Sequence, residues 1–484
     1  MKILYATFEI APYIKVGGLA DVMGSLPKAL SKNKELEIAI FAPLLKCVDR
    51  EKYEIKEIPN SDLTLQFGYA TAKFKLHTAK LPKTDINVFF IENKKYFSSH
   101  DEVYPKHMDP RYEQERFITF SKAILEYTKL INFRPDIIHA NDWHTSMISV
   151  YLKSAYKNDE FFRKTKTVLS IHNLAYQGRY FDDILDFAQI NRDEVFHDKC
   201  LEQYGSLIWL KGAIYCSDKI IAVSPRYAKE ILTQDYGEGL DWALRENQHK
   251  IIGILNGIDY DIFNPETDKN ILKKYTSDTL ENKEEDKKDI IKEFGLEYKK
   301  GRPLIALISR LVEQKGIDLI SQAKNKLKAL NADFIILGTG EKRYEDLFRE
   351  LNANSLNIRA ILDYRADLGN KIYAGADIFL MPSRFEPCGL SQLIALKYGT
   401  IPIVRSTGGL EDTITGYPLN DSNGFKFWRY DGDDMLQAID CALNVYKDKK
   451  TWEIIKKTAM NYDFSWGKSA EQYFEVYCLL NNLY

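Results

Sequence analysis

The sequence predicts an α/β protein with two similar, doubly wound domains. Short apolar runs rich in β-branched residues recur along the chain, and helix-like stretches such as DVMGSLPKALSK and LSQLIALKYG separate several of them. Apolar strands that alternate with helices favour parallel sheets covered on both faces. Twelve such runs are too many for one sheet of ordinary size, so we expect two sheets.

The predicted strands fall into two sets of six. The first set covers residues 2–8, 36–45, 86–92, 135–140, 166–171 and 219–224. The second set covers residues 250–255, 303–309, 332–338, 358–364, 376–383 and 400–406. Because KIIGIL at 250–255 looks like the start of the second set, we expect the first domain to span 1–247 and the second 248–460. The charged stretch 276–293 is expected to be a solvated loop and helix within the second domain.

Composition and charge limit the classes of function. Hydrophobic residues make up 45% and charged residues 28% of the 484 residues, as in ordinary globular proteins. Lysine plus arginine (67) nearly balances aspartate plus glutamate (69), so no global field would attract nucleic acid or an anionic membrane. The six cysteines show no C-x-x-C pair and are expected to be reduced thiols. Glu9 interrupts the first apolar run, and no run is long enough to span a bilayer, so we expect a cytoplasmic protein.

Polar segments follow most of the predicted strands. In open parallel sheets, ligands bind outside the carboxyl ends of the strands, where helix amino termini point their free N–H groups. Seven strand ends here carry such segments: HANDWH, HNLAYQG, NGID, SRLVEQKG, GTGEKR, SRFEPCG and STGGLEDT. This distribution around two sheets predicts a ligand-binding cleft between two domains.

A glycine pair follows the first strand in KVGGLADV. Gly17 and Gly18 would let the backbone approach a ligand closely at the start of a helix, beside Lys15. The segment TGGLEDT, which begins at Thr407 and Gly408, repeats the form, and its Asp412 corresponds to Asp21. Either pair taken alone is more typical of a turn. The flanking lysine favours a ligand-binding loop for the first pair.

Cations and a carboxylate mark the second domain. Arg310 and Lys315 follow a strand in SRLVEQKG, where both could reach one diphosphate, although two exposed basic residues are the simpler alternative. In SRFEPCGLSQL, Pro387 is expected in the first turn of a helix. That position would put Glu386 and the amides of Gly389 and Leu390 at a helix amino terminus, where Glu386 could accept sugar hydroxyls or simply cap the helix.

The histidines do not predict a metal site. His139 and His144 lack zincin spacing, and Asp142 between them, at a strand end, is the better functional candidate. His172 follows the next strand in SIHNLAYQG. The D-x-D pattern at 259–261 is too short to carry weight. Because the sequence contains no G-x-G-x-x-G, no Walker loop and no G-x-S-x-G elbow, a dehydrogenase, a P-loop NTPase and an α/β-hydrolase lose support.

These segments together resemble a known family, the bacterial glycogen synthases and plant starch synthases. KVGGLADV, HANDWH, HNLAYQG, GILNGID, ISRLVEQKG, LGTGE, PSRFEPCGLSQL and STGGLEDT look like its landmarks, in order, from residue 15 to beyond residue 412. The resemblance implies the GT-B arrangement of two Rossmann-like domains around a deep cleft. It also implies retaining transfer of glucose from ADP-glucose to the non-reducing-end 4-hydroxyl of an α-1,4-glucan, without metal or cofactor.

The resemblance also implies roles for individual residues. Lys15 and the Gly17–Gly18 loop would lie against the donor diphosphate or the reacting sugar, and Arg310 and Lys315 would hold the leaving diphosphate. Glu386 and the backbone of His172 would position the glucosyl ring. With Asp142, which would line the same pocket, Glu386, His172, Arg310 and Lys315 are the catalytic candidates. The remaining substrate-binding candidates are Asn256 in that pocket, Tyr364 against adenine, and Asp21, Gly389, Leu390, Thr407 and Gly408. The aromatic and apolar residues of 461–484, at helical spacing, would form a helix that completes the first domain.

Three alternatives remain open at this point. A glucosyltransferase that uses UDP-glucose or a small acceptor would share these features. A non-catalytic glucan-binding protein is disfavoured because Lys15, Arg310, Lys315 and Glu386 are all present. A pyridoxal-phosphate phosphorylase shares the two-domain plan but requires a Schiff-base lysine. For the glycogen synthase reading we expect an open form without ligand and a closed form with ADP.

Overall fold

The chain forms two compact units. The computed structural model describes residues 1–105 and 108–482. Unit 1 comprises Met1–Leu255 together with Trp466–Tyr484, and unit 2 comprises Asn256–Ser465. Among the helices of the described residues, none is long and apolar enough to cross a membrane.

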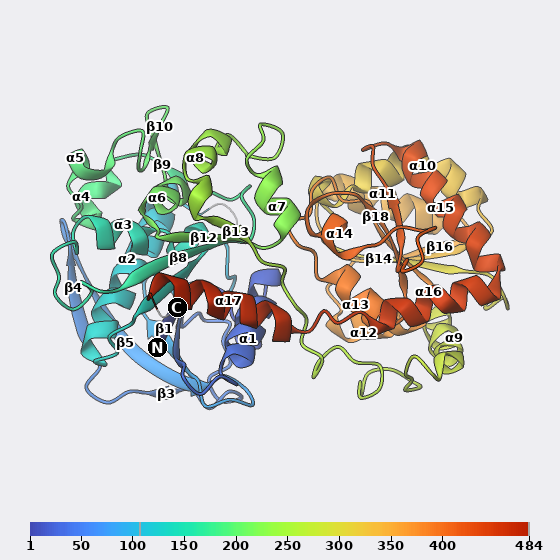
Figure 1. The fold of residues 1–484 in the computed structure, drawn as a ribbon, viewed down its shortest axis with the longest axis horizontal. Helices are drawn as coiled ribbons and strands as arrows, with labels where there is room; N and C mark the ends of the chain where they lie inside the picture. The colour runs from blue at the N-terminus through green and yellow to red at the C-terminus, as the bar shows by residue number, and fades with distance from the viewer. Residues whose placement is uncertain (106–107, 483–484) are drawn as a thin grey trace. The chain divides into compact units, whose positions relative to one another are not determined.

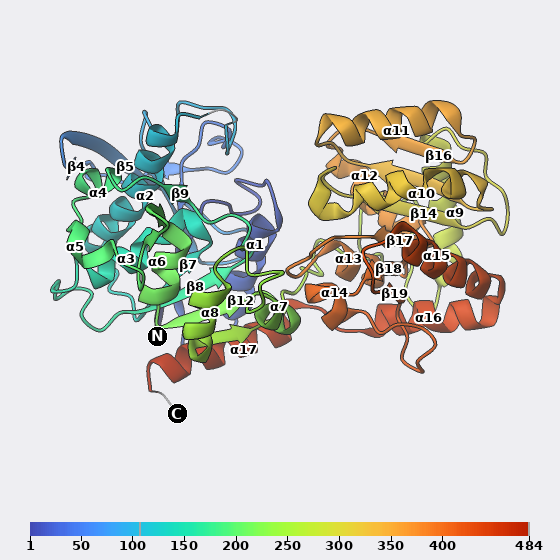
Figure 2. The ribbon, with the colours of Figure 1, turned by 90° about the horizontal axis from the view of Figure 1, so that it is seen from above.

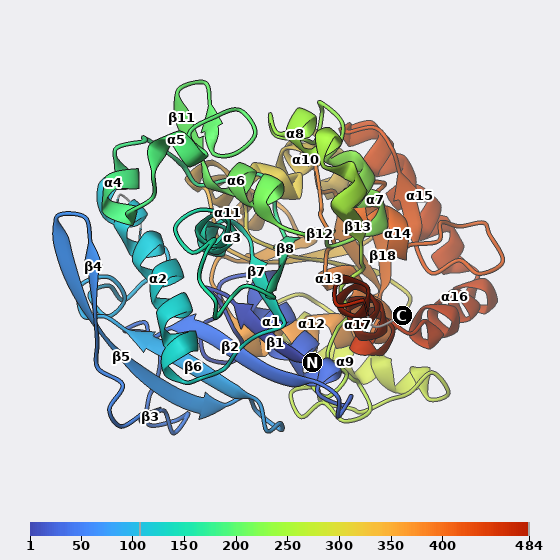
Figure 3. The same cartoon turned by 60° about the vertical axis from the view of Figure 1, so that its left-hand side comes forward.

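Unit 1 is built on a ten-stranded mixed sheet. Its strand order along the main path is β13-β12-β8-β7-β1-β2-β6-β5-β3, and β4 pairs with β5. The bounds are β1 (Lys2–Ala6), β2 (Glu37–Pro43), β3 (Lys56–Glu57), β4 (Leu63–Phe67), β5 (Ala70–Lys80), β6 (Asn87–Glu92), β7 (Ile137–Asn141), β8 (Lys166–Ile171), β12 (Lys219–Ala222) and β13 (Ile251–Gly253). Strands β13 to β6 are parallel, whereas β5 runs antiparallel to β6 (Figure 3).

The helices of unit 1 fall into two groups by their contacts. One group contains α2 (Pro110–Leu130), which contacts α3 (Met147–Lys153), which in turn contacts α6 (Trp209–Cys216). The other contains α1 (Gly18–Leu30), which contacts α17 (Trp466–Leu480). Helix α2 begins where local chemistry predicts, because Pro110 occupies its first turn and the side chain of Asp109 accepts a hydrogen bond from the amide of Tyr112. Shorter elements fill the rest: α4 (Ile184–Ala188), α5 (Arg192–Val195), α7 (Pro225–Glu230), α8 (Asp241–Glu246), and a small sheet of β9 (Arg179–Tyr180), β10 (Glu202–Gln203) and β11 (Ser206–Ile208).

The last helix is fastened to the centre of the first sheet. Helix α17, red in Figure 1, carries Tyr477, whose hydroxyl lies 2.6 Å from the hydroxyl of Tyr5 on β1 and 2.8 Å from Nδ1 of His139 on β7. The Nε2 atom of His139 lies 2.7 Å from the hydroxyl of Ser170 on β8. These side chains are buried, so the network joins three strands to the end of the chain.

Unit 2 has a six-stranded parallel sheet between two helical layers. The strand order is β16-β15-β14-β17-β18-β19, with β14 (Leu304–Ile308), β15 (Asp333–Leu337), β16 (Ile358–Ile361), β17 (Ile378–Met381), β18 (Ile401–Arg405) and β19 (Phe425–Phe427). In Figures 1 and 2 the helices around these strands are α9 (Lys283–Glu293), α10 (Ile317–Ala329), α11 (Lys342–Asn354), α12 (Ala366–Gly375), α13 (Ser391–Lys397), α14 (Gly408–Thr413), α15 (Gly432–Lys447) and α16 (Lys449–Asn461). Helix α10 contacts α11 and α15 in one layer, while α9 contacts α12 and α13 contacts α16 in the other.

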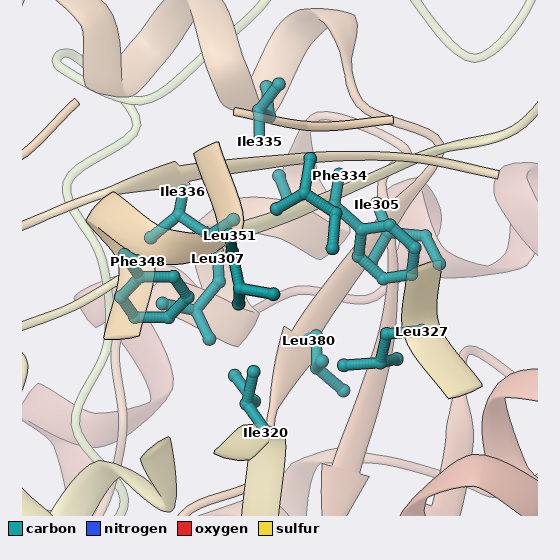
Figure 4. Close-up of a pocket in the computed structure, with 12 residues that line it drawn as sticks. Ile305, Leu307, Ile320, Leu327, Phe334, Ile335, Ile336, Phe348, Leu351 and Leu380 are labelled. Carbon is teal, nitrogen blue, oxygen red and sulfur yellow. The ribbon is translucent and has the colours of Figure 1, made fainter. Parts of the chain in front are cut away.

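A small cavity in unit 2 is part of the core. It measures about 20 Å³ and is lined by apolar side chains of the sheet and of helices α10 and α11, including Ile305, Phe334, Phe348 and Leu380 (Figure 4). A water there would find no polar partners, and the space is far too small for a sugar. The cavity is therefore a packing void.

The structure corrects two expectations about the domain plan. The run KIIGIL does not begin the second sheet, because β13 pairs in parallel with β12 of the first sheet. The units therefore divide between Leu255 and Asn256 rather than between 247 and 248.

The charged stretch 276–293 forms a helix, as expected, but part of it is buried. The Lys283 ammonium donates to the carbonyl of Ala374 at 2.5 Å and to the hydroxyl of Thr400 at 2.7 Å. The Lys287 ammonium lies 2.7 Å from Asp377. These lysines join α9 to α12 and to the residues just before β17 and β18, so the expectation of a fully solvated segment is wrong.

Candidate functional site

The loop after β1 presents Lys15 at the surface of unit 1. Helix α1 begins at Gly18, so the glycine pair does introduce a helix. The Lys15 ammonium lies 2.6 Å from Oδ1 of Asp21 in the first turn of α1, and 41% of the lysine side chain is exposed. The two predicted residues therefore form one ion pair that an incoming anion could reach.

No packing contact among the described residues requires a glycine at position 17. A Cβ atom at this position would meet nothing within 4 Å, and its φ of −143° suits any residue. The amide of Gly17 donates to Oε2 of Glu9 at 2.8 Å, so this N–H group is already used. A contribution of Gly17 to ligand binding therefore has to come from the open space beside it and not from its N–H group.

Glu9 is the residue of this site that sequence reasoning missed. Its buried carboxylate accepts hydrogen bonds from the amides of Val16 and Gly17 and, at 2.9 Å, from the hydroxyl of Tyr104. The available signal was an acidic residue in an apolar run just after a strand. In the sequence alone, Glu9 stands out only as an interruption of a signal-like segment.

Asp142 and His172 meet at the carboxyl ends of β7 and β8. Oδ1 of Asp142 accepts the amide of His172 at 2.7 Å, and the Nε2 atom of His172 lies 3.0 Å from Oδ1 of Asn141. Asp142 has a φ of 55°, an uncommon value for a residue other than glycine. The structure thus brings together two predicted residues 30 positions apart in the chain.

Burial sets the protonation of this cluster. Desolvation raises the pKa of Asp142 to about 7, with a further contribution from the charge of Glu9, although the backbone amides of His172 and Asn173 oppose the shift. Desolvation also lowers the pKa of His172 to about 4. At neutral pH His172 is therefore uncharged, and Asp142 is close to its titration midpoint.

The other two histidines of this region belong to the core. His139 is held by Tyr477 and Ser170, and the ring of His144 stacks on Phe8 with centroids 5.7 Å apart. Within residues 1–105 and 108–482, no group of three or more potential ligands could hold a metal ion.

In unit 2, Lys315 and Glu386 form a close ion pair. The Lys315 ammonium lies 2.6 Å from Oε2 of Glu386, and the hydroxyl of Ser383 donates to the same oxygen at 3.0 Å. The side chains of Lys315 and Glu386 are only 19% and 7% exposed. Two predicted residues on loops after different strands are thus joined at the carboxyl edge of the sheet.

The second glycine pair has a packing role that the first lacks. A Cβ atom on Gly408 would lie 1.9 Å from the carbonyl oxygen of Glu386, and the φ of Gly408 is +46°. A Cβ atom on Gly409 would lie 2.1 Å from the carbonyl oxygen of Cys388, and the Gly409 amide donates to the Glu386 carbonyl at 3.1 Å. With Thr407 buried before α14, this loop supports the backbone that carries Glu386.

The expected position of Pro387 in a helical turn is wrong. Helix α13 begins at Ser391, with Leu390 at its N-cap and Gly389 before it at a φ of +73°. Pro387 and Glu386 therefore lie in the loop before the helix. The chain needs a left-handed residue at 389 to enter α13, which is a local reason for glycine there.

The remaining predicted residues lie near this edge without joining the ion pair. Arg310 is exposed, and no ion pair involves it within the described part of the chain. Asn256 is buried beside Cys388, and the backbone of Asn256 donates a hydrogen bond to the Cys388 thiol. Its Oδ1 atom has no hydrogen-bond partner among the described residues. Tyr364, after β16, is 71% exposed.

Comparison with family models and known sequences gives full-length matches. The model described as "Starch synthase catalytic domain" matches residues 2–246, and "Glycosyl transferases group 1" matches residues 287–459. The chain is 42% identical over 481 residues to a glycogen synthase of Thermosipho melanesiensis, covering 99% of this chain and 98% of that relative. It is 42% identical over 484 residues to a glycogen synthase of Clostridium beijerinckii, with the same coverage.

Two solved structures share the fold. The catalytic domain of starch synthase IV from Arabidopsis thaliana, bound to ADP and acarbose, superposes with a TM-score of 0.92 at 32% identity over 99% of both chains. A sucrose-phosphate synthase from Thermosynechococcus elongatus gives a TM-score of 0.60 at 15% identity over 100% of both chains, which supports the fold alone. The protein has the GT-B glycosyltransferase fold, with one Rossmann-like sheet in each unit.

Proposed function

Since the chain belongs to the glycogen synthase and starch synthase family of glycosyltransferases, we propose that it transfers glucose from ADP-glucose to the non-reducing end of an α-1,4-glucan. The observation that carries this proposal is the full-length likeness to a starch synthase catalytic domain that was solved with ADP and acarbose. An ADP nucleotide and a glucan are therefore the partners we assign to this chain.

Three cationic side chains are the proposed contacts of the donor diphosphate. Arg310 is exposed, while Lys15 and Lys315 each keep one carboxylate partner. As the anomeric bond breaks, negative charge collects on the departing phosphate, and fixed cations stabilise that charge more in the transition state than in the ground state. The paired carboxylates hold the two ammonium groups in place before the nucleotide binds.

Glu386 is proposed to position the glucosyl ring. Its Oε2 atom is occupied by Lys315 and Ser383, and no hydrogen bond to Oε1 is found within the described residues. A carboxylate oxygen fixed in this way can accept a sugar hydroxyl without reorganising. The neutral His172, Asp142 and the buried Asn256 are proposed to line the sugar pocket, with Tyr364 stacked on the adenine.

The proposed reaction retains the anomeric configuration. The bond between C1 of glucose and the phosphate oxygen breaks, the acceptor 4-hydroxyl forms a new bond to C1 on the same face, and its proton passes to the departing phosphate. This scheme needs no protein nucleophile. A covalent glucosyl–protein adduct, trapped and located by mass spectrometry, would contradict it.

We propose that transfer needs neither metal nor prosthetic group, since the cations named above can carry the charge of the leaving group. Full activity after dialysis against EDTA, with no visible absorbance from pyridoxal phosphate, is the expected result. We also propose that the protein acts in the cytoplasm.

Incorporation of labelled glucose from ADP-glucose into glycogen tests the function. UDP-glucose should be used in parallel, and glucose and fructose 6-phosphate should be offered as small acceptors. Incorporation from ADP-glucose into glycogen alone is the expected outcome. Transfer from UDP-glucose, or to a small acceptor only, would favour the alternative activity, and binding of glycogen without transfer would indicate a non-catalytic glucan-binding protein.

A further inference from the structure

The carboxylate of Glu9 lies on the inner side of the loop that carries Lys15. The residue is 5% exposed, and its Oε2 atom accepts the amides of Val16 at 3.0 Å and Gly17 at 2.8 Å. These are the two residues that directly follow Lys15. A carboxylate that accepts two neighbouring amides fixes the position of both peptide units.

Glu9 is itself fixed from two directions. The hydroxyl of Thr7, just beyond β1, donates to the carbonyl of Glu9 at 2.7 Å, and the amide of Thr7 donates to the carbonyl of Phe41 on β2 at 3.0 Å. The other carboxylate oxygen accepts the hydroxyl of Tyr104 at 2.9 Å, from a segment 95 residues away. The ring of Tyr104 in turn stacks near Phe8 and His144, with centroids 5.9 Å and 5.2 Å away.

The outer side of the loop is open. Nothing lies within 4 Å of a Cβ atom placed on Gly17, whereas the inner side is held by Glu9. The amides of Val16 and Gly17 face Glu9 and are not available to an anion, whereas the Lys15 ammonium is. The loop thus has one face that is anchored to the sheet and one that presents an ammonium group.

We propose that Glu9, supported by Tyr104, is a positioning residue that holds the Lys15 loop in the geometry that binds the donor diphosphate. Glu9 does not contact the substrate and acts through the amides of Val16 and Gly17. This inference rests on the proposed function, because it takes Lys15 to be a contact of the nucleotide.

The variants Glu9→Ala, Glu9→Gln and Tyr104→Phe test the proposal. Glu9→Ala removes the acceptor of three hydrogen bonds, so the KM for ADP-glucose and the Kd for ADP should each rise at least about tenfold, with the KM for glycogen unchanged. Glu9→Gln keeps one oxygen that can accept both amides and should restore affinity to within about threefold. Tyr104→Phe removes one hydroxyl and should raise the Kd for ADP about two- to fivefold.

Two further variants separate positioning from a general loss of stability. Asp218→Ala is the matched control, because Oδ2 of Asp218 accepts the amide of Thr167 at 2.8 Å in the same unit, where β8 begins. It should leave the KM for ADP-glucose unchanged. In a Lys15→Ala background, Glu9→Ala should change the Kd for ADP little further, because the residue through which it acts is gone.

The outcomes distinguish this inference from the proposed function. Wild-type affinity for ADP in Glu9→Ala, or a fall in kcat and melting temperature with unchanged KM and Kd, would overturn the inference alone. The inference is likewise overturned if Glu9→Ala does not fold and Tyr104→Phe binds ADP normally. A wild-type protein that neither binds ADP nor transfers glucose would overturn the proposed function and this inference with it.

Discussion

The Lys315 ammonium lies 2.6 Å from Oε2 of Glu386, although the two residues are 71 positions apart. The ion pair is largely shielded from water, since only 19% of the Lys315 side chain and 7% of the Glu386 side chain are exposed. Water therefore cannot easily take the place of either partner. One residue is proposed to meet the diphosphate and the other the sugar. On this proposal the ion pair joins the residue that would meet the diphosphate to the residue that would meet the sugar, both within unit 2.

Removal of either partner should affect the other. We expect Lys315→Ala to lower kcat by about 10²–10³-fold, because a cation at the leaving group is lost and Glu386 keeps an uncompensated charge. The double variant Lys315→Ala/Glu386→Gln should lose less than the product of the two single losses, which steady-state kinetics would measure. Lys324→Ala removes an exposed ion pair with Glu350 at 3.0 Å and should leave kcat unchanged. Strictly multiplicative losses would contradict the linkage.

The two glycine pairs should respond oppositely to alanine. Gly17→Ala should leave the free energy of unfolding within about 0.5 kcal/mol of wild type, since the new Cβ atom would meet nothing within 4 Å and the φ of residue 17 suits any residue. If the donor fills the space beside Gly17, the same variant should reduce kcat/KM at least about tenfold. Gly408→Ala should destabilise the fold by about 1–3 kcal/mol because its Cβ would clash with the Glu386 carbonyl at a positive φ. Denaturant unfolding and initial rates check both. An active Gly17→Ala enzyme would show that the space is not used.

Tyr364 should contribute to nucleotide affinity and not to stability. The residue is 71% exposed, so Tyr364→Ala should leave the melting temperature unchanged. If the ring stacks on adenine, the Kd for ADP should rise about tenfold, and Tyr364→Phe should bind as wild type does. Tyr204 in unit 1, which is 84% exposed, offers a control, since Tyr204→Ala should bind ADP normally. Calorimetric titration with ADP would measure these constants.

Acid should destabilise the protein through its buried histidines. Burial lowers the pKa of His139 and His144 to about 3 and that of His172 to about 4. Below pH 6.5 the unfolded chain takes up protons at these three sites while the folded chain does not, so stability falls as pH decreases from 6.5 towards 4. Asp142, with a pKa raised to about 7, opposes this trend between pH 7 and pH 3.8, because the folded chain binds its proton more readily.

The net slope sets the three histidines against Asp142, and burial also raises the pKa of Asp286 and of Asp333, which act in the same direction as Asp142. Equilibrium denaturation between pH 7 and pH 4.5 should show a declining free energy of unfolding. In Asp142→Asn the decline should be steeper, because one of the opposing carboxylates is absent. A free energy that rises towards pH 4.5 would show that the histidines become protonated in the folded state.

The strand pattern was accessible from the sequence because it depends on local runs of apolar residues. All twelve predicted runs contain observed strands, from β1 to β18. The sequence does not show which of the two sheets contains β13, since the apolar run KIIGIL is compatible with either sheet. Strands β3, β4 and β5 were missed because their half-exposed segments mix polar and apolar residues, as in ATAKFKLHTAK.

The amino-acid chain alone determines which residue types stand at the ends of the strands. These are the cations Lys15, Arg310 and Lys315, the carboxylate Glu386 and the two glycine pairs. Which of these residues meet depends on the folded arrangement. Folding joins Lys315 to Glu386, places Gly408 against the Glu386 backbone, and brings Tyr104 to Glu9. A strand or turn arises from neighbouring residues, whereas a hydrogen bond across 95 residues depends on how separate loops pack on the same sheet.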